Sequence, residues 1–292
     1  MIRYDDTRLL AEVEEKALVL IEAIPYLRRF AGKRIVIKVG GELLLNSDAT
    51  DAFAQDIFLL NSVGIRVVVV HGGGPQITHY MEALGHNPQF VDGQRVTDKQ
   101  TLEIASLVLL GKVNQELLAR INSFGSLGIG FSGVSGNIFF AEMSDEKLGF
   151  VGNIHHVECD PVVRLLDAGY IPVISSLGSD GKGQCYNINA DLAAGELAAS
   201  LKAEKLVILT NTEGVYEDFK ERSQLISEVD AATLKELKKK GSFQAGMIPK
   251  IDAIMTALSR GVASAHVLDG RRKHAVLLEF FTARGIGTMI FP

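Results

Sequence analysis

The stretch that most constrains the fold contains four valines, a histidine, three glycines and a proline, Val67–Pro75. Four consecutive β-branched residues predict a strand that is buried on both faces. Pro75 suits the first position of a helix, where its missing N–H costs nothing. The glycines let backbone N–H groups approach a ligand, and a helix N-terminus attracts anions. The stretch therefore predicts an α/β fold with an anion site at this turn, although a tight turn that binds nothing shows the same pattern.

Size and charge narrow the class of protein. The 292 residues, 47% of them hydrophobic, suffice for one large α/β domain or two modest ones. A formal charge of −5 argues against a nucleic-acid binder, which carries a clustered basic excess. The acidic N-terminus is unlike a signal peptide, and the glycine-rich run Ile121–Ala141 suits turns better than a membrane span. Cys159 and Cys185 show no metal or disulfide spacing, so we expect a cytoplasmic protein with free thiols.

Two lysines stand where local rules disfavour a cation. Lys38 lies inside the predicted buried strand Arg34–Val39, just before Gly40 and Gly41. Its side chain either snorkels to the sheet edge or faces a phosphate at the carboxyl end of the strand. Lys250 lies in the first turn of a predicted helix, where the helix dipole disfavours it. The chain has no Walker A pattern, so phosphoryl transfer would need a cradle of several glycine turns with two lysines as fixed cations.

Further polar residues have ordinary structural interpretations, and some of them have a functional interpretation as well. Arg95 is in a predicted loop, where a guanidinium either is solvated or binds a carboxylate through two hydrogen bonds. We expect Thr97 to cap the helix that follows. Asp191 opens an alanine-rich helix, where an acid is most often a capping charge. Asn187, Asn189 and Asp191 resemble the start of a calcium loop, but Leu192 stands where that loop needs glycine, so we reject calcium.

The N-terminal segment predicts a long helix. Its apolar residues recur three and four positions apart and form a narrow seam of the coiled-coil kind at Leu10, Val13, Ala17, Leu20, Ile24 and Leu27. Such a seam packs either on its own domain or on a neighbouring subunit. Near the other end of the chain, His274–Thr282 is apolar and fits either a helix or a strand.

The chain resembles the acetylglutamate kinases of the amino acid kinase superfamily in six motifs that occur in order. They are KVGGE at Lys38–Glu42, VHGGGPQI at Val70–Ile77, FVDGQRVTD at Phe90–Asp98, YNINAD at Tyr186–Asp191, GMIPKI at Gly246–Ile251 and GIGTMI at Gly285–Ile290. The resemblance implies a three-layer α/β/α sandwich on a mainly parallel sheet of about eight strands, preceded by an N-terminal helix. It also implies an oligomerisation helix at 1–30 and a kinase domain at 31–292, with an acceptor-binding half at about 31–185 and an ATP-binding half at about 186–292.

The resemblance further implies a reaction and a set of site residues. The reaction is ATP-dependent phosphorylation of the side-chain carboxylate of N-acetyl-L-glutamate in arginine biosynthesis, with Mg²⁺ on the nucleotide phosphates and no metal site built from protein alone. The motifs imply catalytic roles for Lys38, Lys250 and Asp191. They assign acceptor binding to Gly73, Gly74, Arg95 and Asn187. They assign contacts with the nucleotide and its phosphates to Lys38, Gly40, Gly41, Asn211, Gly214 and Lys250.

The N-terminal helix and the GIGTMI ending resemble the arginine-inhibited branch of the family. In that branch the helices interlace dimers into a hexamer, so a homohexamer built as a trimer of dimers is expected here. An arginine site is then expected at Lys205, His274, Glu279, Gly285 and Gly287. For His274 the ordinary interpretation is a surface histidine. Whether a PII-type signalling protein docks on the hexamer is left open.

Two positions depart from the family pattern, and several rival functions remain. Asn211 stands where an aspartate is usual, and Glu42 where a neutral residue is commoner. One rival is a related kinase for an aminoadipate derivative, a free amino acid, carbamate or UMP, because one methylene of acceptor length is worth only about 1–3 kcal/mol. A non-catalytic arginine sensor is a rival of another class, although both lysines and Asp191 argue against it. For an acetylglutamate synthase, whose extra acetyltransferase domain adds length, 292 residues are expected to be too few.

Overall fold

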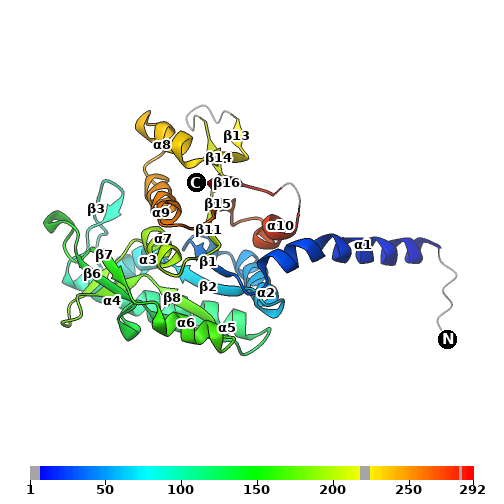
Figure 1. Ribbon diagram of the computed structural model, residues 1–292. Coiled ribbons are helices and arrows are strands. Elements are labelled where there is room, and N and C mark those ends of the chain that lie inside the picture. Colours follow the sequence, from blue (N-terminus) through cyan, green and yellow to red (C-terminus); the bar gives the residue numbers. More distant parts are fainter. Residues whose placement is uncertain (1–6, 218–223, 283–284) are drawn as a thin grey trace.

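A sheet of eight strands runs through the centre of the chain, with helices on both faces (Figure 1). The computed structural model describes residues 7–217, 224–282 and 285–292. The strands follow one another across the sheet as β14 (Glu228–Asp230), β16 (Thr288–Phe291), β15 (Ser264–Asp269), β11 (Lys205–Thr210), β1 (Arg34–Val39), β2 (Arg66–His71), β8 (Ile171–Ser175) and β5 (Gly128–Ser132). Every pairing in this sheet of described residues is parallel except that between β15 and β16. The predicted sandwich on a mainly parallel sheet is confirmed.

The helices and smaller strands complete the layers. The helices are α1 (Thr7–Phe30), α2 (Ser47–Ser62), α3 (Gly74–Ala83), α4 (Lys99–Ser106), the π-helix η2 (Leu107–Asn114), α5 (Gln115–Asn122), α6 (Asp160–Asp167), α7 (Ala190–Ser200), α8 (Ala231–Lys239), α9 (Ile248–Ser259) and α10 (Ala275–Phe281). Short 3₁₀ turns are η1 (Leu43–Leu45), η3 (Ser135–Asn137) and η4 (Glu146–Leu148). The outlying strands are β3 (Phe90–Val91), β4 (Gln94–Arg95), β6 (Phe139–Met143), β7 (Gly152–Val157), β9 (Leu177–Ser179), β10 (Cys185–Asn187), β12 (Val215–Tyr216) and β13 (Leu225–Ile226).

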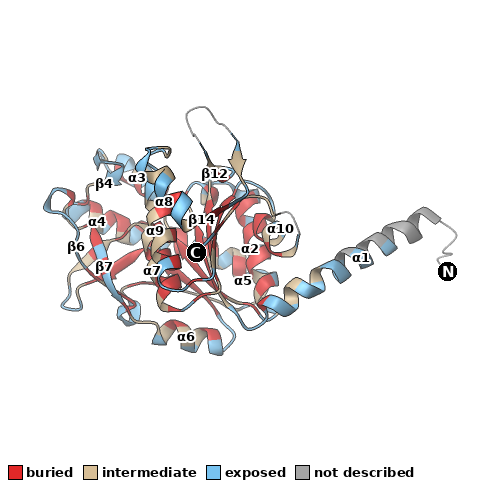
Figure 2. Ribbon diagram, turned by 45° about the horizontal axis from the view of Figure 1, so that its top comes forward, coloured by how far each residue is buried: buried red, intermediate tan, exposed pale blue. Residues whose placement is uncertain are grey.

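The hydrophobic core has one part on each face of the sheet. Val67 and Val69 of β2 pack in a cluster with residues of α2, α5 and α10, and Val68 and Val70 pack in a second cluster with residues of α6, α7 and α9. The four valines are fully buried, and Figure 2 shows the central strands as buried between the helices. The prediction of a strand buried on both faces is confirmed. Parallel sheets are covered in this way because their crossover helices lie on both faces.

Helix α1 extends away from the rest of the chain (Figure 1), and the predicted N-terminal helix is confirmed from Thr7 onward. Three apolar side chains on it are more than half exposed, with Leu18 at 65%, Leu20 at 70% and Ile21 at 60%. Figure 2 shows the same mostly exposed surface along the described part of the helix. The side chains of Leu10 and Val13, which belong to the predicted seam, lie outside the described residues. Exposed apolar side chains gathered on one helix are typical of an interaction surface.

Local details differ from the sequence analysis at one helix start. The cap of α4 is Asp98, whose carboxylate accepts a hydrogen bond from the Thr101 amide at 2.7 Å. Thr97 instead donates its hydroxyl to the Arg95 carbonyl at 3.2 Å. The prediction of Thr97 as the cap was therefore wrong by one residue, because both residue types cap helices.

The segment His274–Thr282, which fitted either a helix or a strand, contains α10. None of the described helices is long and apolar enough to cross a membrane.

Candidate active site

Two clefts lie at the carboxyl edge of the sheet and share part of their walls. The larger cleft has a volume of about 580 Å³ and the smaller cleft about 280 Å³. Lys38, at the end of β1, and Gly41, in the turn after it, line both clefts. In an open parallel sheet, ligands bind at this edge because the loops that follow the strands meet there. A group that passes between two ligands, one in each cleft, would cross beside Lys38 and Gly41.

A carboxylate between two lysines occupies the junction of the clefts. One oxygen of Asp191 lies 2.8 Å from Lys38 Nζ and the other lies 3.2 Å from Lys250 Nζ. The close crossing of α7 and α9 permits this geometry, because a Cβ on Gly195 would lie only 2.6 Å from the Ala253 carbonyl oxygen. The structure thus brings together the three residues that the sequence analysis predicted as catalytic. Lys38 is only 6% exposed, so its side chain does not extend past the sheet edge into solvent.

The charges of this triad depend on one another. Burial is the strongest influence on Asp191 and raises its pKa, but the two ammonium groups outweigh burial and hold that pKa below its ordinary value. Burial lowers the pKa of Lys38, and the Asp191 carboxylate opposes that change. One negative charge between two positive ones leaves a net positive site. The triad can therefore neutralise charge on a transferring phosphoryl group.

The glycine turn predicted as an anion site lies at the N-terminus of α3. Gly73 is the N-cap residue, and a Cβ there would approach Leu109 of the π-helix η2 to 2.8 Å. Behind the turn, the ring of His71 is fully buried and lies 2.9 Å from the side-chain nitrogen of Asn114. Burial lowers the pKa of His71 to about 4, so its imidazole is neutral near pH 7. His71 and Asn114 support the turn from the protein side, a role that the sequence analysis did not predict.

The four residues predicted to bind the acceptor all line the smaller cleft: Gly73, Gly74, Arg95 and Asn187. The Arg95 guanidinium donates to the Gly74 carbonyl at 2.9 Å and to the Thr78 hydroxyl at 2.7 Å, and it lies over the Phe90 ring at 4.9 Å. Burial lowers the pKa of Arg95, which nevertheless stays charged because guanidinium is so basic. Asn187 belongs by number to the expected ATP-binding half, yet it lines the same cleft as Arg95.

The larger cleft contains all but one of the residues predicted to contact the nucleotide. Lys38, Gly40, Gly41, Asn211 and Lys250 line it. Gly214 is not among its lining residues and packs on β16, where a Cβ would approach the Thr288 hydroxyl to 2.5 Å.

Glu42 and Asn211, the two residues that depart from the family pattern, contact each other in the larger cleft. The Asn211 amide donates to the Glu42 carboxylate at 2.5 Å. Among the described residues, no group of three or more His, Cys, Asp and Glu side chains is arranged to hold a metal ion. Glu42 and Asn211 nevertheless offer oxygen atoms at the cleft wall, which suits a hydrated Mg²⁺ that arrives on nucleotide phosphates.

A second polar cluster is buried where α1 meets α10. Lys205 Nζ lies 2.9 Å from His266, whose other ring nitrogen lies 2.7 Å from Glu279. Burial lowers the pKa of Lys205 to about 8 and also lowers the pKa of His266. Lys205 Nζ is 5.1 Å from the ring centroids of both Phe30 and Phe280.

Four of the five residues predicted for the arginine site lie in or beside this cluster. A Cβ on Gly285 would lie 2.8 Å from a Glu279 oxygen, and one on Gly287 would lie 2.2 Å from the carbonyl of Val267, the residue after His266. His274 is not part of this cluster. It stands just before α10, and its ring nitrogen lies 2.7 Å from the carboxylate of Asp56 in α2. The histidine in contact with Lys205 and Glu279 is His266. No local pattern in the sequence pointed to His266, because it meets Lys205 only through the pairing of β15 with β11.

Comparison with known proteins finds relatives over nearly the whole chain. Residues 33–269 match the amino acid kinase family. The chain is 46% identical over 288 residues to an acetylglutamate kinase from Nostoc punctiforme. The match covers 98% of this chain and 97% of that protein. It is 47% identical over 280 residues to an acetylglutamate kinase from a Synechocystis species, covering 96% of this chain and 94% of that one.

Solved structures show the same fold. An N-acetylglutamate synthase from Neisseria gonorrhoeae, complexed with coenzyme A and N-acetyl-glutamate, superposes with a TM-score of 0.83 at 30% identity over 94% of this chain. This chain spans 63% of that synthase. A carbamate kinase from Giardia lamblia bound to AMP-PNP superposes with a TM-score of 0.66 at 18% identity, over 89% of this chain and 99% of that one. The chain belongs to the amino acid kinase family, and within that family to the acetylglutamate kinases.

Proposed function

We propose that this chain transfers the γ-phosphoryl group of ATP to the side-chain carboxylate of N-acetyl-L-glutamate and releases ADP and N-acetyl-L-glutamyl 5-phosphate. The observation that carries the proposal is the meeting of the two clefts at the Lys38–Asp191–Lys250 triad. A carboxylate oxygen of the acceptor attacks the γ-phosphorus, and the bond from that phosphorus to the β–γ bridging oxygen breaks. No proton must be removed, because the nucleophile is already an anion. The protein therefore contributes position and charge.

Each member of the triad has a distinct part in this step. Lys38 faces both clefts, so its ammonium neutralises charge on the phosphoryl group as that group moves. Lys250 lines the larger cleft and acts from the side of the leaving ADP. Asp191 touches both lysines and orients them. The backbone N–H groups of Gly41 and Gly73, in the two glycine turns, are assigned to phosphoryl oxygens.

The two clefts divide the substrates between them. The smaller cleft is assigned to the acceptor, with Arg95 on its α-carboxylate and Asn187, Gly73 and Gly74 along the rest of the molecule. The larger cleft is assigned to ATP. A bound Mg²⁺ would supply further neutralisation of the nucleotide phosphates, and Glu42 and Asn211, which line the larger cleft, would hold its water ligands.

The reaction is tested by ATP consumption with five acceptors: N-acetyl-L-glutamate, glutamate, N-acetyl-aminoadipate, carbamate and UMP. Turnover restricted to N-acetyl-L-glutamate is the expected result. Faster turnover with N-acetyl-aminoadipate would reassign the acceptor. No turnover with any of the five would contradict a kinase role and favour an arginine sensor.

We expect Arg95→Lys to raise the KM for N-acetyl-L-glutamate about 10- to 100-fold, because lysine keeps the charge but loses the two-pronged hydrogen bonding to a carboxylate. The KM for ATP should change much less, since Arg95 lines only the smaller cleft of the two. Steady-state kinetics with each substrate varied in turn measures both values. Arg164→Lys is the matched control, because that side chain is 78% exposed on α6. An equal rise in both KM values would contradict the assignment of Arg95 to the acceptor.

We also propose that arginine inhibits the enzyme at the buried cluster beside α1, and that α1 joins dimers into a cytoplasmic hexamer. The Glu279 carboxylate is a partner for a guanidinium group, and it lies in a cluster that touches the end of α1 through Phe30. The exposed Leu18, Leu20 and Ile21 on α1 favour burial against another subunit.

Arginine inhibition should disappear in Glu279→Gln, while kcat without arginine stays close to that of the unmodified protein, because the cluster is separate from both clefts. Deleting residues 1–28 should also remove the inhibition and reduce the mass measured by light scattering from hexamer to dimer. Glu228→Gln, at an exposed position on β14, is the control and should stay inhibited. The same arginine sensitivity and the same hexamer mass after the deletion would contradict the proposal.

A further inference from the structure

The side-chain amide of Gln76 lies between the two glycine turns of the site. Gln76 is in the first turn of α3 and is only 8% exposed. Its amide nitrogen donates a hydrogen bond of 2.8 Å to the carbonyl oxygen of Gly41, and both groups are buried. The turn after β1 is thus tied to the helix that begins at the turn after β2. None of the steps assigned above uses this side chain.

The two turns are packed so closely that only glycine fits at the contact. A Cβ on Gly41 would lie 2.7 Å from the Gln76 amide oxygen, 2.9 Å from Pro75 Cδ and 3.0 Å from Gly73 Cα. The N–H of Gly41 is separated from its own carbonyl by the two single bonds at Cα. Because the close packing around this Cα limits rotation about those bonds, a fixed carbonyl restricts the directions that this N–H can take.

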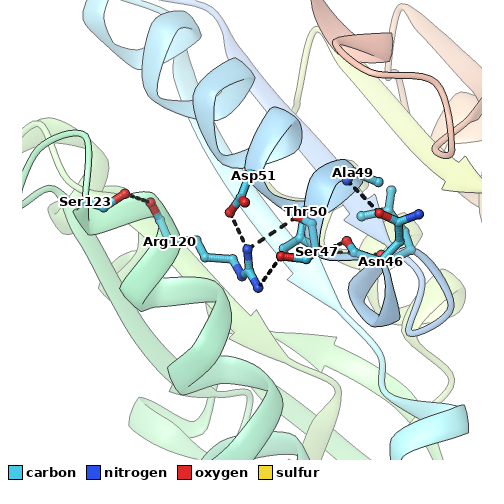
Figure 3. Close-up of polar contacts among 8 residues, drawn as sticks. Asn46, Ser47, Ala49, Thr50, Asp51, Arg120 and Ser123 are labelled. Atoms are coloured by element: carbon cyan, nitrogen blue, oxygen red, sulfur yellow. Dashed lines mark hydrogen bonds and ion pairs between the residues drawn. The ribbon is translucent and has the colours of Figure 1, made fainter.

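The chain that follows Gly41 is anchored at a second place (Figure 3). Asn46 caps α2 by accepting a hydrogen bond from the Ala49 amide at 3.0 Å. Arg120, from α5, pairs with Asp51 and donates to the carbonyl and hydroxyl oxygens of Ser47 at 3.3 and 3.2 Å. Between this anchor and β1, Gln76 is the side chain that donates to the backbone of the glycine pair. Removing its donor would free the turn that contributes the Gly41 N–H to the site.

We propose that Gln76 is a positioning residue for phosphoryl transfer: its amide fixes the Gly41 carbonyl and thereby aims the Gly41 N–H at the transferring group. This inference rests on the proposed kinase function. A buried amide with a purely structural part would affect stability alone. A positioning residue affects kcat more than KM, because misplacing a group that contacts the transition state slows the chemical step.

Two near-isosteric substitutions test the proposal. Gln76→Met removes the donor and Gln76→Glu replaces it with a carboxylate that repels the Gly41 carbonyl when ionised. At about pH 8 both should lower kcat on the order of 10- to 100-fold with little change in either KM. Near pH 6 the kcat of Gln76→Glu, relative to the unmodified protein, should rise, because burial raises the pKa of the introduced carboxyl and its protonated form donates again. Gln76→Met should show no such recovery.

Controls and a second measurement complete the test. Gln55→Met and Gln55→Glu, at an exposed position on α2, should keep the original kcat at both pH values. Amide hydrogen exchange over residues 39–46, followed by mass spectrometry, should be faster in Gln76→Met than in the unmodified protein. Unchanged kcat, no relative recovery of Gln76→Glu, or unchanged exchange would each overturn the proposal. If the unmodified protein turns over none of the acceptors, the proposed function fails, and the exchange rates alone decide whether Gln76 holds the turn.

Discussion

Lys38→Met should lower kcat about a thousandfold or more, the largest loss expected from a single substitution in this chain. Removal of one fixed charge from a phosphoryl-transfer site typically costs a factor of this order. Lys38 is the cation that faces both clefts, so no other lysine of the triad replaces its position. Methionine has a similar length and fills the buried space, and Asp191 keeps Lys250 as its partner at 3.2 Å. The loss should therefore fall on chemistry rather than on folding.

Three measurements separate these effects. Single-turnover rates report the chemical step, equilibrium binding of ADP and N-acetyl-L-glutamate reports the clefts, and circular dichroism reports folding. The matched control is Lys182→Met, because Lys182 is exposed in the loop between β9 and β10 and should leave the rate unchanged. A variant that keeps more than about a tenth of the original rate would contradict a transition-state role for Lys38, since such a role is worth far more than one factor of ten.

The central fold was predictable from sequence because its signals are local. The buried strands are continuous apolar runs, and Val67–Val70 shows the pattern of a strand covered on both faces. Glycine followed by proline predicted the start of α3. The cap of α4 was predicted one residue too early, at Thr97 instead of Asp98, because adjacent residues of capping type differ only in the backbone angles that they finally adopt. Short strands such as β3 and β9 gave no signal of their own, since two or three residues are too few to show a period.

The site was predictable where a residue breaks a local rule. Lys38 in a buried strand and Lys250 at a helix start were anomalies, and the structure places both on Asp191. Contacts between segments far apart in the sequence could not be predicted from such local anomalies. The pairing of Asn211 with Glu42 joins residues 169 positions apart, and His266 rather than His274 meets Lys205 because β15 lies beside β11. Gln76 was missed because a polar residue in the first turn of a helix breaks no rule.

Asp191→Asn should impair stability as well as catalysis, because Asp191 is the only carboxylate of the triad. Without its charge, the buried Lys38 loses its counter-ion and faces the like charge of Lys250. Removing one partner of a buried ion pair typically lowers the free energy of unfolding by about 3–5 kcal/mol. We expect a loss of that size at neutral pH, together with a fall in kcat as the two lysines lose their orientation. Denaturant unfolding and steady-state kinetics measure the two losses.

The pH dependence of that loss gives the sharper test. The pKa of Asp191 is lower in the folded chain than in the unfolded chain, so its ionisation stabilises the fold at every pH above the unfolded value of about 3.9. This contribution decreases as pH falls through the folded pKa and is absent when both states are protonated. The difference in unfolding free energy between the unmodified protein and Asp191→Asn should therefore be largest near neutral pH and shrink below about pH 4. Asp92→Asn is the control, since Asp92 is exposed in the turn between β3 and β4. A difference that stays constant from neutral to acid pH would show that the carboxylate contributes through packing and not through its charge between the two lysines.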